Sequence, residues 1–106
     1  MGVLSELTGV SISGIENVHD YMQVKFSSGA ALTIYNNCRF EDGACKAVGS
    51  TVKSTTESGD EIVIILEGGG SIHIGLQEDD YVGPEAMVLS QEGAPDVVWN
   101  YRFIPI

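Results

Sequence analysis

The sequence predicts an all-β fold of two repeated three-stranded antiparallel meanders and a C-terminal strand, arranged as a curled sheet or half-open barrel with very little helix. The first observation behind this prediction is the segment 22–35, MQVKFSSGAALTIY, in which apolar and polar residues alternate on both sides of Ser27-Ser28-Gly29. Strict alternation around a short turn that contains glycine is typical of a β-hairpin with one buried face.

The second observation is an internal repeat. The pattern of the first hairpin returns forty positions later, so that Gly69 corresponds to Gly29. The repeated units span about residues 9–36 and 49–76. A chain of 106 residues has the usual size of one domain, and a content of 43% hydrophobic residues is enough for one core. We therefore expect a single domain over residues 1–106.

The first unit is expected to begin with one helical turn over residues 2–7. Apolar residues at positions 10, 12 and 15 mark a first strand that bends at Gly14. The hairpin then supplies two strands, over residues 21–27 and 30–35. Residues 38–40 extend or flank the second of these strands before the turn Glu41-Asp42-Gly43.

The second unit repeats this plan with two differences. Its first strand, around Val52, contains few apolar residues, which indicates an edge or bent strand. Residues 62–66, IVIIL, form a continuous apolar run, which is typical of a central strand covered on both faces. We expect Val63 and Ile65 to pack beneath a second layer, for which the N-terminal turn is a candidate. A glycine triplet then makes a tight turn into a strand over residues 71–76.

The C-terminal part is less regular. Pro84 excludes a central strand at its own position. Residues 85–89 form either a helical turn opened by Pro84 or an extended segment, and residues 91–96 form a loop. Residues 97–103 alternate again, which predicts a final strand whose inward face closes the core with Val97, Trp99, Tyr101 and Phe103. A half-exposed Trp99 is the alternative. The count is about seven strands.

Charge is the strongest compositional signal, because fifteen acidic residues face five basic ones and the net charge is −10. Such a chain is repelled by nucleic acid and by anionic membranes and is attracted to a basic partner. An acidic surface also keeps a protein soluble without any partner. No apolar run reaches the roughly 18 residues of a membrane span, and the N-terminus lacks the features of a signal peptide, so we expect a cytoplasmic location.

The sequence contains no recognisable catalytic or metal-binding motif. Cys38 and Cys45 are too few for the four ligands of a structural zinc site. A disulfide between them is geometrically feasible, but a reducing cytosol favours two free thiols. His19 and His73 each stand alone, and the acidic residues do not follow the spacing of an EF-hand loop. We therefore expect no enzymatic activity, no metal and no cofactor.

The candidate partner-binding residues are acidic side chains of loops and the tyrosines beside them. Acidic groups around an aromatic side chain suit a basic partner, because the charges speed encounter and the ring supplies affinity. A solvated acidic loop without a partner is the alternative interpretation. The predicted site comprises Glu78, Asp79, Asp80, Tyr81, Glu85, Asp60, Glu61, Asp20 and Tyr21.

Three segments give the chain a resemblance to small bacterial immunity proteins: FSSGAALTIYN at 26–36, LEGGGSIHIGL at 66–76 and YVGPEAM at 81–87. Proteins of this kind accompany the toxins of contact-dependent growth inhibition and other polymorphic toxin systems. The resemblance implies that the chain binds the C-terminal domain of a cognate toxin and neutralises it by stoichiometric blocking. It carries over no individual binding residue.

A nuclease is the toxin class that best suits an acidic inhibitor, because its basic active site attracts phosphate and an acidic protein can occupy that cleft. The alternative function is a small acidic β-sheet module without catalysis, which binds a ligand or forms a homodimer through an edge strand. The first hypothesis requires the acidic loops for association, whereas the second does not.

Overall fold

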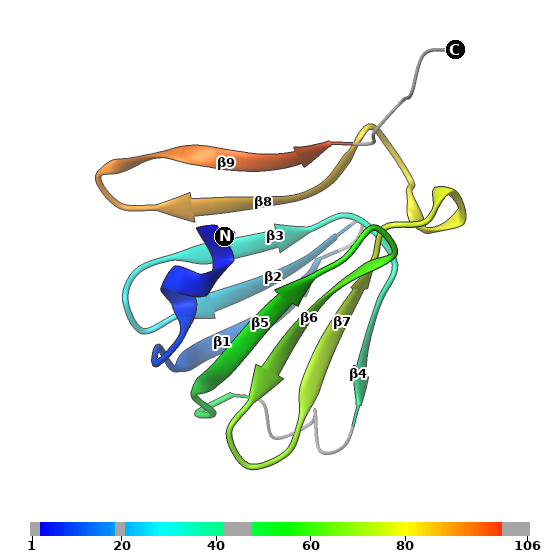
Figure 1. Cartoon of the computed structure of the whole chain (residues 1–106). Helices are drawn as coiled ribbons and strands as arrows, with labels where there is room; N and C mark the ends of the chain where they lie inside the picture. The colour runs from blue at the N-terminus through cyan, green and yellow to red at the C-terminus, as the bar shows by residue number, and fades with distance from the viewer. Residues whose placement is uncertain (1–2, 19–20, 42–47, 101–106) are drawn as a thin grey trace.

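The computed structural model describes residues 3–18, 21–41 and 48–100, which form two antiparallel sheets (Figure 1). The strands are β1 (Ile12–Val18), β2 (Tyr21–Phe26), β3 (Ala31–Ile34), β4 (Cys38–Glu41), β5 (Val52–Glu57), β6 (Glu61–Leu66), β7 (Ser71–Gly75), β8 (Glu85–Gln91) and β9 (Ala94–Asn100). A 3-10 turn, η1 (Val3–Leu7), precedes β1, and another, η3 (Glu78–Asp80), separates β7 from β8.

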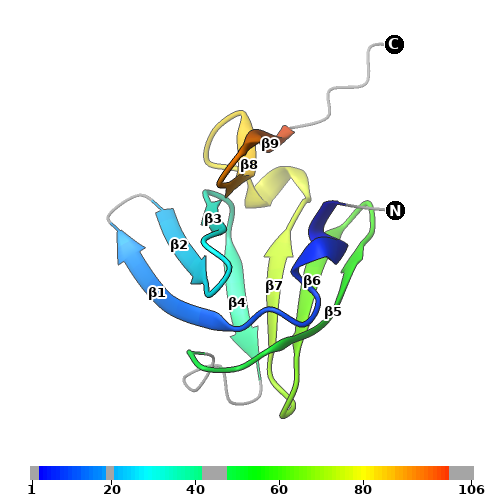
Figure 2. The same ribbon diagram turned by 90° about the vertical axis from the view of Figure 1, so that its left-hand side faces the viewer.

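The five-stranded sheet has the order β1-β2-β3-β8-β9, and the four-stranded sheet has the order β4-β7-β6-β5. The sheets meet near the starts of β1 and β5, at a bridge between Ser11 and Thr51. From this junction they diverge around the core without closing into a barrel (Figure 2). The predicted all-β fold with a curled sheet is confirmed. Within the described residues, no helix is long and apolar enough to cross a membrane.

The two hairpin units have the same geometry forty positions apart. The pairing of β1 with β2 has the register of β5 with β6, and the pairing of β2 with β3 has that of β6 with β7. Both first strands contain a register shift, which follows Ile12 in one and Val52 in the other. The hairpin turns place Gly29 at a φ of 95° and Gly69 at 108°, a left-handed backbone that glycine adopts readily.

Reciprocal backbone hydrogen bonds join the two units where β1 and β5 begin. Each bond has a counterpart in which the residues are exchanged between the units, so the junction has local two-fold pseudosymmetry. The two pairs of bonds are Gly9 N–H to Val52 O (2.9 Å) with Gly49 N–H to Ile12 O (2.8 Å), and Ile12 N–H to Ser50 O (2.8 Å) with Val52 N–H to Val10 O (2.9 Å).

The strand that follows each three-stranded unit belongs to the sheet of the other unit. After β3 the chain crosses at Asn36, and β4 pairs with β7 of the second unit. After β7 it crosses back, and β8 pairs with β3 of the first unit. Asn36 is 4% exposed at this crossing, and its Nδ2 donates to Gly75 O at 2.8 Å. Residues 38–40 therefore do not extend or flank β3 but begin a strand of the opposite sheet.

The inward side chains of both sheets form one core. Its strand residues are at most 3% exposed and include Val24, Phe26, Leu32, Ile34, Ile62, Ile64, Leu66, Ile72, Ile74, Met87 and Leu89. Leu4 and Leu7 of η1 join the same core, because η1 packs against β5. The prediction that the N-terminal turn covers Val63 and Ile65 is therefore wrong. Burying both leucines in the core removes more apolar surface from water, and Val63 and Ile65 stay half-buried on the outer face of the central strand β6.

The C-terminal hairpin extends the five-stranded sheet. Residues 85–89 are extended and belong to β8, and β9 begins at Ala94, inside the segment expected to be a loop. Pro95 is tolerated there because β9 is an edge strand. Trp99 packs against the core, and its Nε1 donates to Glu57 Oε2 at 3.2 Å. The last three residues of the predicted final strand lie outside the described residues, as does Cys45, whereas Cys38 is a free cysteine.

Substitution of Gly49 by Ala tests the pseudosymmetric junction. Gly49 has a φ of 95°, and a Cβ placed there meets no atom within 4 Å, so backbone strain is the only cost. We expect Gly49→Ala to lower the free energy of unfolding by about 1–2 kcal/mol in urea titrations. Gly59 also faces open space but does not have a left-handed φ, so Gly59→Ala is the control and should leave the midpoint nearly unchanged. Equal midpoints for the two variants would contradict this account.

Candidate functional site

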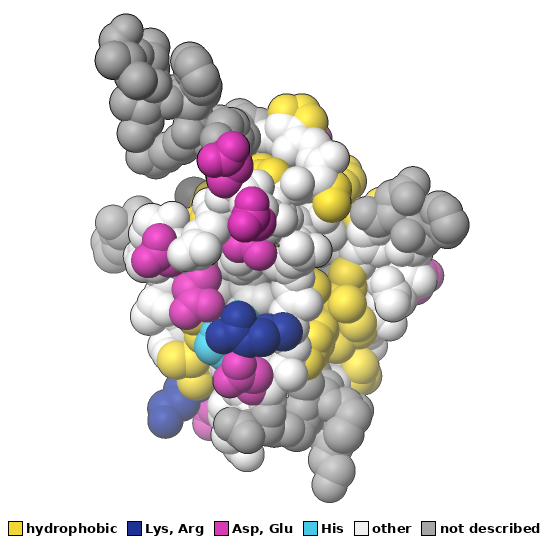
Figure 3. Space-filling model, turned by 90° about the vertical axis from the view of Figure 1, so that its right-hand side faces the viewer, with side chains coloured by type: hydrophobic (Ala, Val, Ile, Leu, Met, Phe, Trp, Pro, Cys, Tyr) yellow, Lys and Arg dark blue, Asp and Glu magenta, His cyan; other side chains and the backbone are white. Residues whose placement is uncertain are grey.

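The candidate site lies on the outer face of the four-stranded sheet, at the end where β7 leads into η3. A hollow of about 440 Å³ opens there. Figure 3 shows this side of the molecule, where a basic side chain and the histidine lie among acidic side chains. The hollow is lined by Asn37, Cys38, Arg39, Asp60, Glu61, His73, Gly75, Gln77 and Asp80.

Ser58 positions two of the acidic residues. Its Oγ accepts hydrogen bonds from the backbone N–H groups of Asp60 and Glu61, both at 3.2 Å. Its own N–H donates to Glu61 O at 2.9 Å and closes the turn between β5 and β6. The Leu76 N–H donates to Asp60 O at 2.8 Å, which ties this turn to the end of β7. These hydrogen bonds fix the backbone of Asp60 and Glu61 at the edge of the hollow.

Asp80 reaches the hollow from η3. Its Oδ2 accepts the Gln77 N–H at 3.1 Å, and its backbone O accepts the Asn37 N–H at 3.0 Å. The carboxylate lies directly over Gly75, where a Cβ would come within 2.2 Å of Asp80 Cγ. Glycine is thus required at position 75 for Asp80 to take this place.

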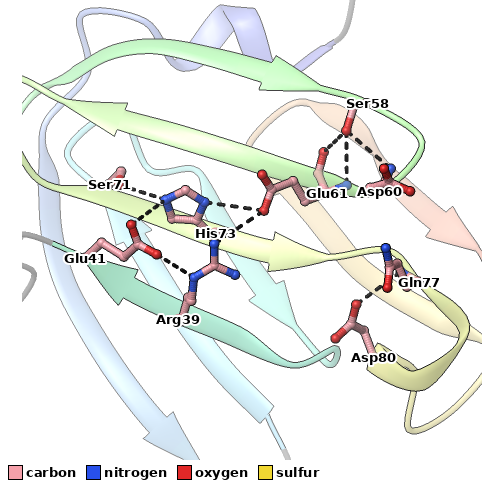
Figure 4. Close-up of polar contacts among 9 residues, drawn as sticks. All are labelled: Arg39, Glu41, Ser58, Asp60, Glu61, Ser71, His73, Gln77 and Asp80. Atoms are coloured by element: carbon pink, nitrogen blue, oxygen red, sulfur yellow. Dashed lines mark hydrogen bonds and ion pairs between the residues drawn. The ribbon is translucent and has the colours of Figure 1, made fainter.

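A cluster of polar side chains surrounds His73, which itself lines the hollow (Figure 4). His73 is on β7, between Arg39 of β4 and Val63 of β6, and its side chain is 14% exposed. Its Nε2 lies 2.9 Å from Ser71 Oγ and 3.6 Å from Glu41 Oε1, and its Nδ1 lies 3.4 Å from Glu61 Oε1. We call Arg39, Glu41, Glu61, Ser71 and His73 the His73 cluster.

Arg39 is the counter-ion of this cluster. Its Nε donates to Glu41 Oε2, and its Nη2 lies 3.8 Å from Glu61 Oε1. The bond from Arg39, with the nearby His73, holds the pKa of Glu41 below the usual glutamate range. The same bond raises the pKa of Arg39, and the charges of Glu61 and Asp80 add to the effect. One guanidinium therefore faces three carboxylates.

The order Ser71–His73–Glu61 resembles the hydroxyl, base and carboxylate of a hydrolase. Acyl transfer also needs N–H donors aimed at the developing oxyanion. β7 is an interior strand, so its backbone N–H groups pair with β4 and β6. Cys38 is no better as a nucleophile, because burial raises the pKa of its thiol. Among the described residues, no group of three or more His, Cys, Asp or Glu side chains is arranged to hold a metal ion.

The structure brings together part of the predicted site. Asp60, Glu61 and Asp80 line the hollow. Glu78 and Asp79 are exposed in η3, and Tyr81 follows them directly. The other predicted residues that the structure describes do not line the hollow.

Two of those remaining residues belong to the five-stranded sheet. Glu85 begins β8, and Tyr21 begins β2 and packs edge-on against Tyr35 with ring centroids 5.7 Å apart. Asp20 lies outside the described residues. The prediction thus combined residues of two different surfaces.

Sequence reasoning missed Arg39, Glu41 and the role of His73. The interpretation of His73 as an isolated side chain is wrong, because it contacts Ser71, Glu41 and Glu61. A hairpin centred on the glycine triplet would have placed His73 opposite Val63 and diagonal to Glu61. No comparable signal indicates Arg39 and Glu41, because β4 pairs with a strand of the other unit.

Comparisons with known proteins find no matching family model, no matching curated protein and no matching solved structure.

Substitution of Gly75 by Ala tests the placement of Asp80. The new Cβ must displace the carboxylate and break its bond to the Gln77 N–H, so we expect η3 to loosen and the stability to fall by about 1 kcal/mol. Hydrogen exchange at the Gln77 amide should accelerate. Gly83→Ala is the control, because a Cβ at Gly83 meets nothing within 4 Å. Unchanged exchange in Gly75→Ala would show that Asp80 is not held over Gly75.

Substitution of Arg39 by Gln tests the counter-ion. We expect the pKa of Glu41, followed by NMR of its side-chain carboxyl, to rise toward the ordinary glutamate value. A carboxyl with a lowered folded-state pKa stabilises the fold above its unfolded-state value and loses that contribution as the pH falls. The variant should therefore be less stable than wild type near neutral pH. This difference in stability should shrink as the pH falls below 4.5, the ordinary pKa of glutamate. Lys25→Gln, which removes a cation paired with Glu16 on the other sheet, should leave Glu41 unchanged.

Proposed function

We propose that this chain is an immunity protein that binds the basic C-terminal domain of a cognate toxin, for which a nuclease is the first candidate. It would block the toxin stoichiometrically, in the cytoplasm, without chemistry of its own. The observation that carries the proposal is the convergence of Asp60, Glu61 and Asp80, from two separate turns, around one hollow.

The charge of this region suits a cationic partner. Three carboxylates line the hollow, and Glu78 and Asp79 stand exposed beside it. Arg39 and Glu41 largely compensate each other, so the surroundings of the hollow remain negative, as does the whole chain at −10. Such a field raises the rate of association with a basic protein and makes that rate sensitive to salt.

The hollow is also preorganised. Ser58 fixes the backbone of Asp60 and Glu61, the Gln77 N–H holds the Asp80 carboxylate, and Arg39 and His73 contact the Glu61 carboxylate. A cationic side chain that enters would meet the Glu61 and Asp80 carboxylates already in place, so less ordering entropy is lost on binding. Val82, two residues after η3 in the sequence, is 71% exposed and adds an apolar side chain to the surface of this segment.

A self-assembling module is the second candidate function. β9 is an edge strand of seven residues, and its Val98 is 39% exposed. Such an edge can pair with the same strand of another copy. This candidate makes no use of the hollow, so the two functions predict different results for charge variants.

The test uses three forms of the full chain as bait at low salt. These are wild type, a hollow variant (Asp60→Asn, Glu61→Gln, Asp80→Asn), and a control variant with the same net charge whose changes lie outside the hollow (Glu6→Gln, Glu67→Gln, Glu92→Gln). We expect wild type and the control variant to retain one basic protein at one-to-one stoichiometry from the native cell lysate. Association with the hollow variant should be at least about tenfold slower at low salt.

Equal retention and equal association rates for all three baits would contradict binding through the hollow. A protein that retains nothing and sediments as a dimer would overturn the proposal in favour of the self-assembling module.

A further inference from the structure

We infer that His73 makes the binding of a cationic partner at this hollow depend on pH, with binding tightening as the imidazole loses its proton. The inference rests on the proposed function, because it concerns the same hollow. It adds a regulation that net charge alone does not supply, since carboxylates and guanidinium groups keep their charges between about pH 6 and 8. Histidine is the side chain whose charge changes in that range.

Both ring nitrogens of His73 face carboxylates from the strands on either side. Glu41 of β4 lies 3.6 Å from Nε2, and Glu61 of β6 lies 3.4 Å from Nδ1. On β7 itself Ser71 is the polar neighbour, and the cross-strand neighbours are Arg39 on β4 and the apolar Val63 on β6. From η3, Asp80 interacts with Arg39. A proton on His73 would thus be shared between two acidic groups.

Protonation changes the charge that a partner meets. With a neutral imidazole, the charged groups of the hollow and the His73 cluster sum to −3, from one cation (Arg39) and four anions (Glu41, Glu61, Asp60 and Asp80). With a protonated imidazole the sum is −2. The Glu41 and Glu61 carboxylates are then matched by two internal cations, and only Asp60 and Asp80 remain for the partner.

Glu61 couples the protonation of His73 directly to the binding of the partner cation. It lines the hollow, and its Oε1 also faces His73 Nδ1 and Arg39 Nη2. A protonated Nδ1 donates a charge-assisted hydrogen bond to Glu61, which a partner cation must then share or replace. Because the His73 side chain is only 14% exposed, solvent and salt screen this interaction less than they screen a surface pair.

Thermodynamic linkage gives the direction in which the affinity for the partner cation changes with pH. Protonation of His73 and binding of the partner cation compete for Glu61, so each lowers the affinity of the other by the same factor. The dissociation constant should therefore fall as the pH rises. Coupling between neighbouring sites is commonly about 5- to 150-fold, and we expect about tenfold between about pH 5.5 and pH 8.

The experiment measures binding of a synthetic decalysine peptide, whose charge does not change in this range, because lysine titrates near about pH 10.4. Isothermal titration calorimetry with full-length wild type, His73→Gln and His19→Gln gives the dissociation constant at each pH. His19→Gln is the matched control, because it removes the other histidine. Wild type and His19→Gln should bind about tenfold tighter at the higher pH, and His73→Gln should bind with nearly constant affinity.

A second measurement does not depend on the stability of His73→Gln. The ring resonances of His73 in the wild-type chain, assigned by comparison with His19→Gln, report its proton uptake. Saturating decalysine should move the midpoint of this uptake to lower pH. An unmoved midpoint, or the same pH dependence in His73→Gln as in wild type, would overturn the inference.

The hollow variant separates this inference from the proposed function. Wild-type binding that is lost in the hollow variant but is flat with pH would leave the proposed function standing and overturn the role of His73. Binding by the hollow variant equal to wild type, or no binding by wild type at any pH, would overturn both.

Discussion

The exchange of fourth strands between the two units is the constraint on which the rest of the structure depends. β4 is only four residues long and has one pairing partner, β7, while its Cys38 and Phe40 pack against the core. Pairing of β4 within its own unit would carry Arg39 and Glu41 to the other sheet. The site therefore requires both units, and the opening of either one removes strands from both sheets. This interdependence favours unfolding in one cooperative transition.

The pseudosymmetry shows how one backbone plan carries two different surfaces. The positions of Glu61, His73 and Gly75 in the second unit correspond to Tyr21, Thr33 and Tyr35 in the first. In the first unit, the outer face carries the Tyr21–Tyr35 ring contact and a hydrogen bond from Gln23 Nε2 to Thr33 Oγ1 at 3.3 Å. The register of the two hairpins is the same, so the difference arises from their side chains and from η3, which supplies Asp80 and has no counterpart between β3 and β4. A bulky residue at position 75, like Tyr35, would exclude Asp80, so the charged site can form in only one of the two halves.

Local sequence patterns made the hairpins and part of the candidate site predictable. Alternation over residues 22–35 and the glycine turns specify hairpins, because a strand shifted by one residue would expose its apolar side. Acid density indicated Asp60, Glu61 and Asp80. The crossing at Asn36 was not predictable, because it depends on pairing between segments far apart in the chain, and the four residues of β4 carry only a weak pattern. The predicted site included Tyr21 because it follows Asp20 in the sequence. Proximity in sequence does not show that Tyr21 belongs to the five-stranded sheet, away from the hollow.

Arg39 explains how several carboxylates can converge around one hollow. Several carboxylates close together repel one another, and without a counter-ion they would favour proton uptake or separation of the strands that carry them. Arg39 on β4 contacts Glu41 of its own strand and Glu61 of β6, so it bridges across β7 and offsets this repulsion. For the proposed cationic partner, the same contacts would limit affinity, because a partner cation would compete with Arg39 for Glu61. Arg39 thus holds the site together from within, and a proton on His73 would add a second internal cation between Glu41 and Glu61.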